Sequence, residues 1–404
     1  MGTEVYFDNN ATTRLLPEVV AAMSPFLTEL YGNPSSIHRF GSQVAEKIGE
    51  ARARVASLIG ASDPIEIIFT SCGTEGDNAA IRGMLEAHPD KRHIVTTQVE
   101  HPAVLGLCQL LEKRGYRVTW LGVNQDGMLD LEELRNSLTD DTAVVSVMAA
   151  NNETGVMFPI DKIGEIVKAK GIPFHVDAVQ AAGKVPLKVK DSPVDLLTIS
   201  GHKFHAPKGI GALYVRRGVT FPPFIIGGHQ EKNRRAGTEN VASIVGMGEA
   251  AESAQRSLVK QSERVRVLRD QLEDELLRSC PDCRINGRAS GRLPNTSNVS
   301  FRYLEGESIL VLLDQFGICA STGSACTAGS SEPSHVLRAM GVAPDWLQGA
   351  VRFSLSRFST AEEVSYVNEK VPLIVQRLQG LSALGKLAGQ QEKPRAGNGI
   401  GVRG

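Results

Sequence analysis

Short apolar runs alternate with amphipathic segments through the first half of the chain. Seven runs rich in Val and Ile show little polar alternation, which is typical of strands covered on both faces of a sheet. We predict these strands at Ile65–Thr70, Ile94–Thr97, Val118–Leu121, Ala143–Ala149, Phe174–Asp177, Leu196–Ser200 and Gly211–Val215. Between them, apolar residues recur at helical spacing, as at Ile160, Ile163 and Val167. The alternation predicts an α/β fold with a mostly parallel seven-stranded sheet.

The pattern changes near Gly246. A long charged segment, Ala250–Leu277, has helical periodicity and is long enough to bridge two domains. Strand-like and helix-like stretches then alternate, which predicts a smaller α+β domain; they are Ser297–Tyr303, Glu307–Gln315, Gly317–Ser321 and Ala361–Leu381. We predict a large domain over 14–257, a small domain from 1–13 and 258–384, and a disordered tail over 385–404, which is rich in Gly and polar residues.

Composition narrows the class of protein. A chain of 404 residues is longer than one hydrophobic core usually absorbs, which agrees with two domains. Lys and Arg total 44 against 45 Asp and Glu, so no basic excess indicates nucleic acid or an anionic membrane as a partner. We find no signal peptide and no apolar run of membrane-spanning length. Six cysteines are too few for a disulfide scaffold, and a reducing cytoplasm is the expected location.

Two charged residues follow buried strands directly. Asp177 ends the strand that begins near Pro173, and Lys203 comes three residues after the strand that ends at Ser200. Because parallel strands bring their carboxyl ends to one edge of a sheet, we expect both side chains at a ligand site there. An amine and a carboxylate at one site suit pyridoxal phosphate (PLP): the lysine forms an imine, and the aspartate keeps the pyridine nitrogen protonated.

Other polar segments reach the same edge. Small residues in Thr70–Glu75 suit an anion at a helix N-terminus, although an ordinary N-cap at Thr74 is the simpler alternative. His101 lies between a strand and a helix, where its ring suits stacking and proton transfer. The segment Asn151–Gly155 reads equally well as a plain turn. Arg234–Asn240 is either a solvated loop or a loop that presents donors to a phosphate across a dimer interface.

The cysteines and histidines offer further chemistry. Cys326 stands among small residues that cannot bury it well, so we interpret it as a nucleophile on an exposed loop. Cys108 and Cys319 look like core residues, and the Cys280–Cys283 pair is a weak redox or metal signal. The histidines in Gly201–Lys208, His202 and His205, would supply at most half a metal site.

Together these motifs identify a resemblance. The chain resembles the cysteine desulfurases, most closely their nitrogen-fixation branch, NifS, from Tyr6 to about Leu381. The motifs that carry the likeness are Tyr6–Thr13, Tyr31–Ser36, Thr70–Glu75, Val99–Pro102, Asn151–Gly155, His175–Gln180, Ser200–Lys203, Arg235–Asn240, Gly323–Cys326 and Val351–Leu355. The resemblance implies the type I PLP-dependent (aspartate aminotransferase-like) fold, a homodimer, and PLP as the cofactor.

It also implies a role for each matched residue. Lys203 would carry the cofactor as an imine, and His101 would stack on its ring and move protons. Asp177 would pair with the pyridine nitrogen and Gln180 with the phenolic oxygen. The phosphate would be held by Gly73, Thr74, Ser200 and His202, with Thr238 from the partner subunit. Asn152 and Arg352 would fix the substrate carboxylate, and Asn152 would also contact the cofactor.

The implied activity is the removal of sulfur from L-cysteine, giving L-alanine and a persulfide on Cys326. An iron–sulfur scaffold protein, serving nitrogenase or housekeeping clusters, would accept the sulfur, with Cys326 as a transient cluster ligand. The alternatives are another type I PLP enzyme, such as an aminotransferase or a selenocysteine lyase, and a sulfur-delivery scaffold without PLP. A metal hydrolase rests only on His202, His205 and the Cys280–Cys283 pair.

Overall fold

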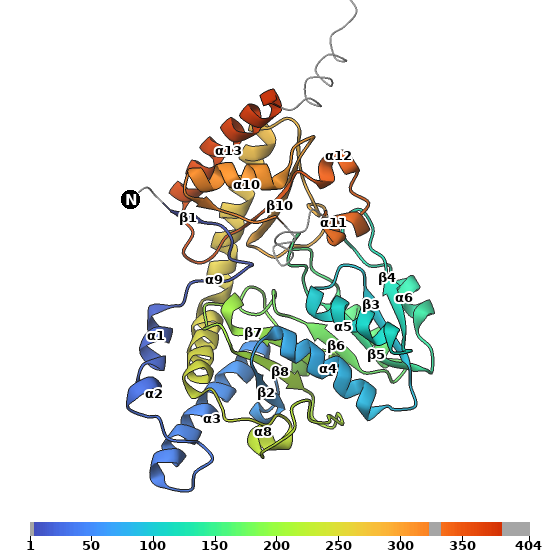
Figure 1. The fold of residues 1–404 in the computed structure, drawn as a ribbon, viewed down its shortest axis with the longest axis vertical. Coiled ribbons are helices and arrows are strands. Elements are labelled where there is room, and N and C mark those ends of the chain that lie inside the picture. The colour runs from blue at the N-terminus through green and yellow to red at the C-terminus, as the bar shows by residue number, and fades with distance from the viewer. Residues whose placement is uncertain (1–3, 323–332, 382–404) are drawn as a thin grey trace, which may run out of the picture.

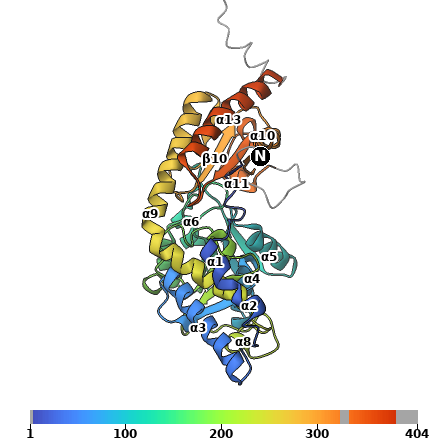
Figure 2. The same ribbon diagram turned by 90° about the vertical axis from the view of Figure 1, so that its left-hand side faces the viewer.

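The computed structural model describes residues 4–322 and 333–381. Its elements form a larger group around a seven-stranded sheet and a smaller group above it (Figure 1). The long helix α9 (Val241–Ser279) runs alongside both groups, as the side view in Figure 2 makes plain. None of the helices in the described ranges is long and apolar enough to cross a membrane.

The large sheet has the strand order β2-β8-β7-β6-β5-β3-β4. Neighbouring strands from β7 through β6, β5 and β3 to β4 run parallel, and β8 pairs antiparallel with both β7 and β2. The strands are β2 (Ile67–Thr70), β3 (His93–Thr97), β4 (Arg117–Leu121), β5 (Thr142–Met148), β6 (Phe174–Asp177), β7 (Leu196–Ser200) and β8 (Gly211–Val215). All seven predicted strands are confirmed, and β2, β6 and β7 end at one edge of the sheet.

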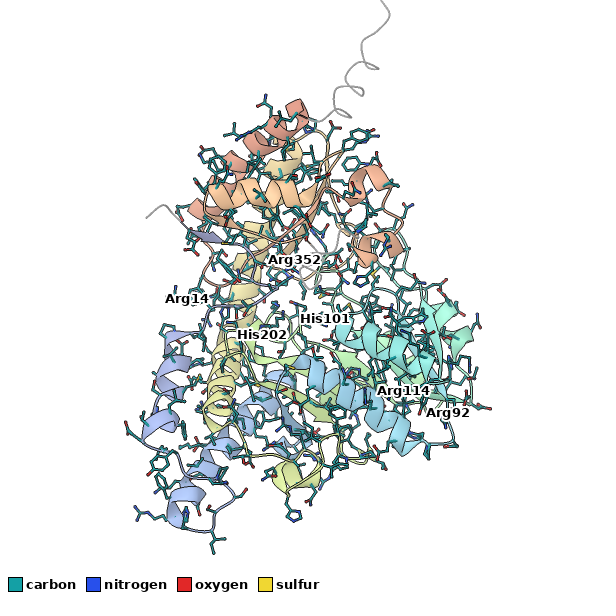
Figure 3. All side chains as sticks on the ribbon, in the orientation of Figure 1. Arg14, Arg92, His101, Arg114, His202 and Arg352 are labelled. Carbon is teal, nitrogen blue, oxygen red and sulfur yellow. The ribbon has the colours of Figure 1, made fainter. Side chains whose placement is uncertain are left out.

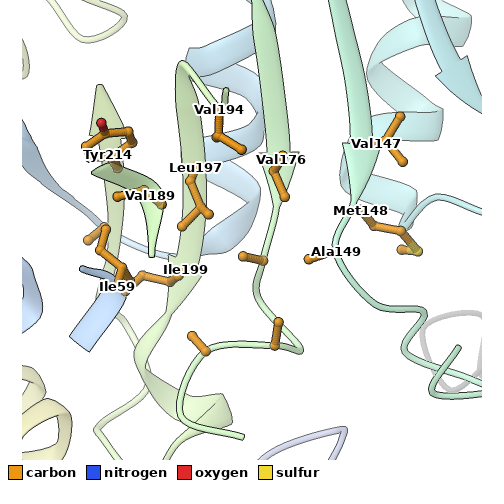
Figure 4. Packing of buried hydrophobic residues seen from close by; sticks show 14 of the residues in the cluster. Ile59, Val147, Met148, Ala149, Val176, Val189, Val194, Leu197, Ile199 and Tyr214 are labelled. Atoms are coloured by element: carbon orange, nitrogen blue, oxygen red, sulfur yellow. The ribbon is translucent and has the colours of Figure 1, made fainter. Parts of the chain in front are cut away.

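Helices cover both faces of this sheet. Alternate residues of one strand enter different cores: Ile67 and Phe69 pack on one side, and Ile68 packs on the other. Figure 4 shows the first side, where Val176, Leu197 and Ile199 meet residues of neighbouring elements. The helices of this group are α1 (Pro17–Met23), α2 (Pro25–Thr28), α3 (Arg39–Ile59), α4 (Gly73–Ala87), α5 (Pro102–Lys113), α6 (Leu131–Ser137), α7 (Ile160–Lys168) and α8 (Gln230–Asn233). Burial on both faces explains why most of these strands are rich in apolar residues and lack polar alternation.

The smaller group confirms the predicted α+β part of the fold. Its three-stranded antiparallel sheet has the order β12-β10-β9, and the N-terminal strand β1 pairs in parallel with β11. The strands are β1 (Val5–Tyr6), β9 (Cys283–Ile285), β10 (Thr296–Phe301), β11 (Ile318–Cys319) and β12 (Ala350–Ser354). The helices are α10 (Gly306–Gln315), α11 (His335–Ala339), α12 (Pro344–Leu347) and α13 (Ala361–Leu381).

Some sequence expectations need adjustment. The predicted long helix begins nine residues earlier than expected, at Val241, and passes without a break through the predicted domain boundary at 257 and 258. That boundary therefore stays a prediction, and the predicted tail over 385–404 lies outside the described residues. Cys108 is buried as expected, but Cys319 is only partly buried because it lies on the short strand β11. Cys280 and Cys283 are buried free thiols.

Candidate active site

A pocket of about 290 Å³ opens between the two groups of elements, at the carboxyl edge of the large sheet. Figure 3 shows His101 and His202 below this junction and Arg352 above it. The predicted site residues that line the pocket are Gly73, Thr74, His101, Asn152, Asp177, Gln180, Ser200, His202, Lys203 and Arg352. Residues as far apart in the chain as Gly73 and Arg352 therefore meet at one site.

Lys203 enters the pocket from a short 3₁₀ turn, Gly201–Lys203, that follows β7 directly. Its Nζ donates to the main-chain oxygens of Asn10 and Ala11 at 2.6 and 2.9 Å. The N-terminal segment therefore lies beside the pocket at the carboxyl edge of the large sheet and holds the amine by its carbonyl groups.

Asp177 is the last residue of β6 and is buried. Its Oδ1 accepts a hydrogen bond from the Val179 amide at 2.9 Å. Burial raises the pKa of this carboxyl to about 6, while the Val179 amide and the charge of Lys203 act in the opposite direction. A cationic N–H in the pocket would favour the ionised carboxylate further, as a protonated pyridine nitrogen would.

The first turn of α4 forms one wall of the pocket. The helix begins at Gly73, so the N-cap is Cys72, and the alternative of an N-cap at Thr74 is wrong. The Cys72 side chain makes no capping bond within the described structure, which leaves the first N–H groups to a ligand. A Cβ atom at residue 73 would lie 2.8 Å from Val179 Cγ2, so only glycine fits there without a shift.

The Ser200 hydroxyl is the clearest indication that a ligand binds at this wall of the pocket. Its Oγ is buried, lines the pocket, and has no hydrogen-bond partner among the described residues. Buried hydroxyl groups are rarely left unpaired in proteins. A phosphate oxygen beside the α4 N-terminus would pair with it.

His101 is the N-cap of α5, and its Nδ1 accepts a hydrogen bond from the Ala103 amide at 3.1 Å. Burial, together with the charges of Lys203 and His335, lowers the pKa of His101 to about 4. The imidazole is therefore neutral in this structure and carries its proton on Nε2, because Nδ1 is the acceptor. The predicted proton transfer must begin from this tautomer.

His202 and His205 do not share a partner. His202 Nδ1 lies 3.2 Å from Thr12 Oγ1, whereas His205 Nδ1 lies 2.7 Å from the main-chain oxygen of Arg14. Burial and the charge of Lys203 lower the pKa of His202 to about 4. Each imidazole ring is therefore held by the N-terminal segment, at a different residue, and the two rings do not form one site.

Arg352 reaches the pocket from β12 with 2% of its surface exposed. Its Nη1 donates to the Asn152 main-chain oxygen at 3.1 Å, and its Nη2 donates to Asp8 Oδ1 at 2.8 Å. Its Nε is buried without a partner in the described ranges. A guanidinium has five N–H donors, so three remain for a substrate carboxylate.

The turn at Asn151–Gly155 is both a turn and a pocket wall. Asn151 Oδ1 accepts from the amides of Glu153 and Thr154, and Gly155 has a φ of 77°. This geometry presents Asn152 to the pocket next to Arg352. The segment is therefore a turn, but not only a turn, because it also lies at the pocket.

Cys326 lies outside the described residues, but the chain on either side of its segment is held near the pocket. Ser321 pairs through its main chain with Arg352 in both directions, at 3.2 and 2.6 Å. On the far side, His335 Nε2 lies 3.0 Å from the main-chain oxygen of Glu100, the neighbour of His101.

Thr238 is exposed and is not among the described residues that line this pocket. Its loop is tied to α4 nevertheless, because Arg235 donates to both carboxylate oxygens of Glu75 at 2.9 and 3.2 Å. The predicted role of Thr238 in the site of a partner subunit stays a prediction.

The sequence indicated no role for several residues that shape the pocket. Asn10 and Ala11 supply the acceptors for Lys203, and Asp8 pairs with Arg352. All three lie in the motif Tyr6–Thr13, so the sequence marked this segment without indicating what its residues do. Asp77, in α4, is buried against His175, and burial together with Asp177 raises its pKa. The sequence pattern around Asp77 does not distinguish this buried carboxyl from a solvated carboxyl on an amphipathic helix.

Similarity to known proteins shows the family to which the chain belongs. The aminotransferase class-V family matches residues 5–367. The chain belongs to this family. A cysteine desulfurase of Trichormus azollae is 60% identical over 378 residues, which cover 94% of each chain. The cysteine desulfurase NifS of Azotobacter vinelandii is 53% identical over 391 residues, covering 97% of each chain.

A solved structure described as a NifS-like protein superposes with a TM-score of 0.87 at 41% identity, covering 93% of this chain and 100% of the other. The predicted family and its NifS-like branch are therefore confirmed, as is the fold.

Proposed function

We propose that this protein is a PLP-dependent cysteine desulfurase that takes sulfur from L-cysteine and leaves L-alanine. The observation that carries the proposal is the pocket in which Lys203 and Asp177 meet, in a chain so similar to cysteine desulfurases. An amine and a buried carboxylate at the carboxyl edge of a sheet are the two groups that PLP chemistry needs most.

The residues present fit the cofactor. The α4 N-terminus, with Gly73 and Thr74, would hold the phosphate together with the unpaired Ser200 hydroxyl and His202. Asp177 would accept from the protonated pyridine nitrogen, and Gln180 would donate to the phenolic oxygen. When bound, PLP withdraws electrons from the cysteine carbons and so weakens the bond between carbon and sulfur.

The remaining pocket residues bind the substrate and move protons. Three N–H groups of Arg352 and the side chain of Asn152 would orient the substrate carboxylate. Lys203 would hold the cofactor through its Nζ, and the same amine, once released by the amino group of the substrate, is the group that would move protons at the substrate carbons. His101 would lie against the cofactor ring with its proton on Nε2, the nitrogen that is not tied to Ala103.

Cys326 would accept the sulfur. It follows Thr322 by four residues, and an extended chain of that length spans roughly 13 Å. Since Ser321 pairs with Arg352, the thiol has the reach to arrive at the substrate that Arg352 holds. The thiolate would attack the substrate sulfur and form a persulfide; the electron pair of the broken bond stays on carbon, which takes a proton and becomes alanine.

The downstream part of the proposal is the transfer of this sulfur to an iron–sulfur scaffold protein, with Cys326 as a transient cluster ligand. The likeness to a NifS enzyme supports a role in nitrogenase cluster assembly. In a homodimer, the exposed Thr238 would complete the phosphate site of the other subunit. An aminotransferase needs no thiol, so Cys326 distinguishes it from a desulfurase.

The test is incubation of the full chain with PLP and L-cysteine, followed by measurement of alanine and of a trapped persulfide on Cys326. We expect both products, and Cys326→Ala should lose the persulfide and most alanine formation. Cys319→Ser is the matched control, because it removes a partly buried thiol in the same part of the chain and should retain activity. Alanine formation at the wild-type rate in Cys326→Ala would contradict the role of this thiol.

A further inference from the structure

A second lysine lies beside the pocket and bonds directly to one of its residues. Lys184 Nζ donates to Gln180 Oε1 at 2.9 Å and to the Gln180 main-chain oxygen at 3.0 Å. The two residues stand four apart in a tight turn after β6, in which the Ala182 amide bonds to the Ala178 oxygen. The turn therefore places the ammonium group over the amide.

The other end of the same amide is also fixed. Gln180 Nε2 donates to the main-chain oxygen of Asn10 at 3.1 Å, the same oxygen that accepts from Lys203. Asn10 cannot shift easily, because its own amide group bonds to Thr296 at 2.8 Å and to Asn295 at 2.9 Å. Gln180 thus lies between a fixed acceptor and a cation.

These two contacts determine the orientation of the Gln180 amide. A lysine ammonium only donates hydrogen bonds, and a main-chain oxygen only accepts them. Oε1 must therefore face Lys184, and Nε2 must face Asn10. The second hydrogen on Nε2 is the donor that the Gln180 side chain has left, so Gln180 can act as a donor in the pocket.

The surroundings of Lys184 indicate that its position has a purpose. No carboxylate pairs with it anywhere in residues 4–322 and 333–381. Burial, together with the positive charges of Lys203 and Arg352, lowers the pKa of Lys184 to about 7. A partly buried cation held only by an amide and a carbonyl is costly for the fold. A surface lysine would be expected to point into solvent instead.

We propose that Lys184 is a positioning residue that fixes the Gln180 amide as a hydrogen-bond donor to the phenolic oxygen of the cofactor. This inference rests on the proposed function, since it assumes that PLP is the ligand. Without the ammonium group, only the Asn10 oxygen holds the Gln180 amide in this orientation. The orientation turned by 180°, which presents Oε1, a second acceptor, to an oxygen that carries negative charge, then becomes less costly. Lys184 therefore acts on the cofactor only through Gln180.

The test is a double-mutant cycle on the full-length chain with Lys184→Met, Gln180→Leu and the combined variant. Titration with PLP, followed by absorbance, gives the dissociation constant and the position of the bound cofactor's absorption band. We expect each single variant to weaken PLP binding about tenfold, and the combined variant to be no weaker than Gln180→Leu alone. Lys188→Met is the matched control, because this exposed lysine is in the same segment and should bind PLP as the wild type does.

Lys184→Arg covers the case in which the Met variant folds poorly, because it keeps a cation that can donate to Oε1. It should restore most of the affinity that Lys184→Met loses. Additive effects in the cycle, or a Lys184→Met variant with wild-type affinity and spectrum, would overturn the inference.

A urea-unfolding cycle with the same variants and no PLP tests the contact between Lys184 and Gln180 separately. Coupled losses of stability support the inference, and additive losses overturn it. If the wild-type chain binds PLP but makes no alanine from cysteine, the proposed function is contradicted. The two mutant cycles would still test the role of Lys184, because neither of them measures alanine formation.

Discussion

Arg352 donates to Asp8 across 2.8 Å, although 344 residues separate the two in the chain. The pair joins the N-terminal segment to strand β12 at the wall of the pocket. The carboxylate uses one N–H of Nη2 and fixes the plane of the guanidinium. A substrate carboxylate is then met by donors whose direction is already set, which lowers the entropy lost on binding.

Replacing Arg352 by lysine should therefore damage substrate binding more than it damages folding. Lysine keeps the charge but loses the planar group that can bond to Asp8 and to a carboxylate at once. We expect KM for cysteine to rise about tenfold to a hundredfold, from the loss of charge-assisted hydrogen bonds. Steady-state kinetics of alanine formation measures this change. Arg302→Lys, at a partly exposed arginine paired with Asp345, is the control and should leave KM unchanged.

Replacing Lys203 by alanine should abolish the absorption band of a protonated imine while the phosphate site remains. Lys203 and Asp177 line the same pocket, and Lys203 is the one lysine among the described residues of that lining, so its removal takes away the amine that would form the covalent bond. Absorbance of the purified protein after addition of PLP checks the prediction. Lys208→Ala is a suitable control, being an exposed lysine five residues further along. An unchanged band in Lys203→Ala would mean that another amine carries the cofactor.

Replacing Ser200 by alanine should have opposite effects on the free and the PLP-bound protein. In the free protein the change removes a buried hydroxyl without a partner in the described structure, so stability should rise or stay the same. With PLP present, the lost bond to the phosphate should weaken binding about tenfold.

Thermal unfolding with and without PLP measures both effects. Ser297→Ala is the matched control: its hydroxyl is also buried and unpaired within the described ranges, but it lies on β10 and does not line the pocket. Ser297→Ala should change the stability of the free protein in the same direction as Ser200→Ala does. It should leave the increase in unfolding temperature on PLP binding equal to that of the wild type. If PLP raised the unfolding temperature equally in the wild type and in both variants, Ser200 would be excluded from the phosphate site.

Glu100 should make stability fall as the pH rises. Burial raises its pKa to about 8, and Oε1 accepts from Thr97 Oγ1 at 2.7 Å and from the Met148 amide at 3.0 Å. In the folded state the carboxyl binds its proton between pH 4.5 and about 8, where the unfolded chain has lost it. The folded state thus holds more protons in that window, so stability declines by at most about 1.4 kcal/mol per pH unit.

Glu100→Gln cannot titrate, and its amide keeps the same acceptor. Relative to the wild type, this variant should become more stable step by step from pH 5 to pH 8. Urea unfolding at several pH values checks the slope, with Glu165→Gln, an exposed glutamate on α7, as the control. Two parallel profiles would show that Glu100 is ionised in the folded protein.

The sequence predicted the sheet because local patterns carried the information. The runs that became β5, β6 and β7 are mostly apolar and fully buried, since helices cover both of their faces. The same logic placed Asp177 and Lys203 at one edge, as their strands are parallel neighbours. Strand ends differ by up to two residues where a local motif intervenes: β2 begins at Ile67 because the capping box at Asp63 holds Pro64–Glu66 in a 3₁₀ turn.

Contacts between distant segments could not be predicted in this way. The acceptors for Lys203 come from Asn10 and Ala11, and nothing in their local pattern indicates that the N-terminal segment lies at the carboxyl edge of the large sheet. Lys184 looked like any surface lysine, because its bond to Gln180 depends on the conformation of one turn. The N-cap at Cys72 was missed since the residue preferences for capping favour Thr74, whereas a ligand site leaves the cap side chain unused.

Helix α9 has a mechanical consequence for the whole molecule. Its first half contributes Ile244, Met247 and Ala250 to the core of the large sheet, and its second half contributes Leu268, Leu272 and Leu276 to the core of the smaller group. One rigid rod is therefore embedded in both cores. The pocket lies between these cores, so a bend in this one helix would change the distance between the two walls of the pocket.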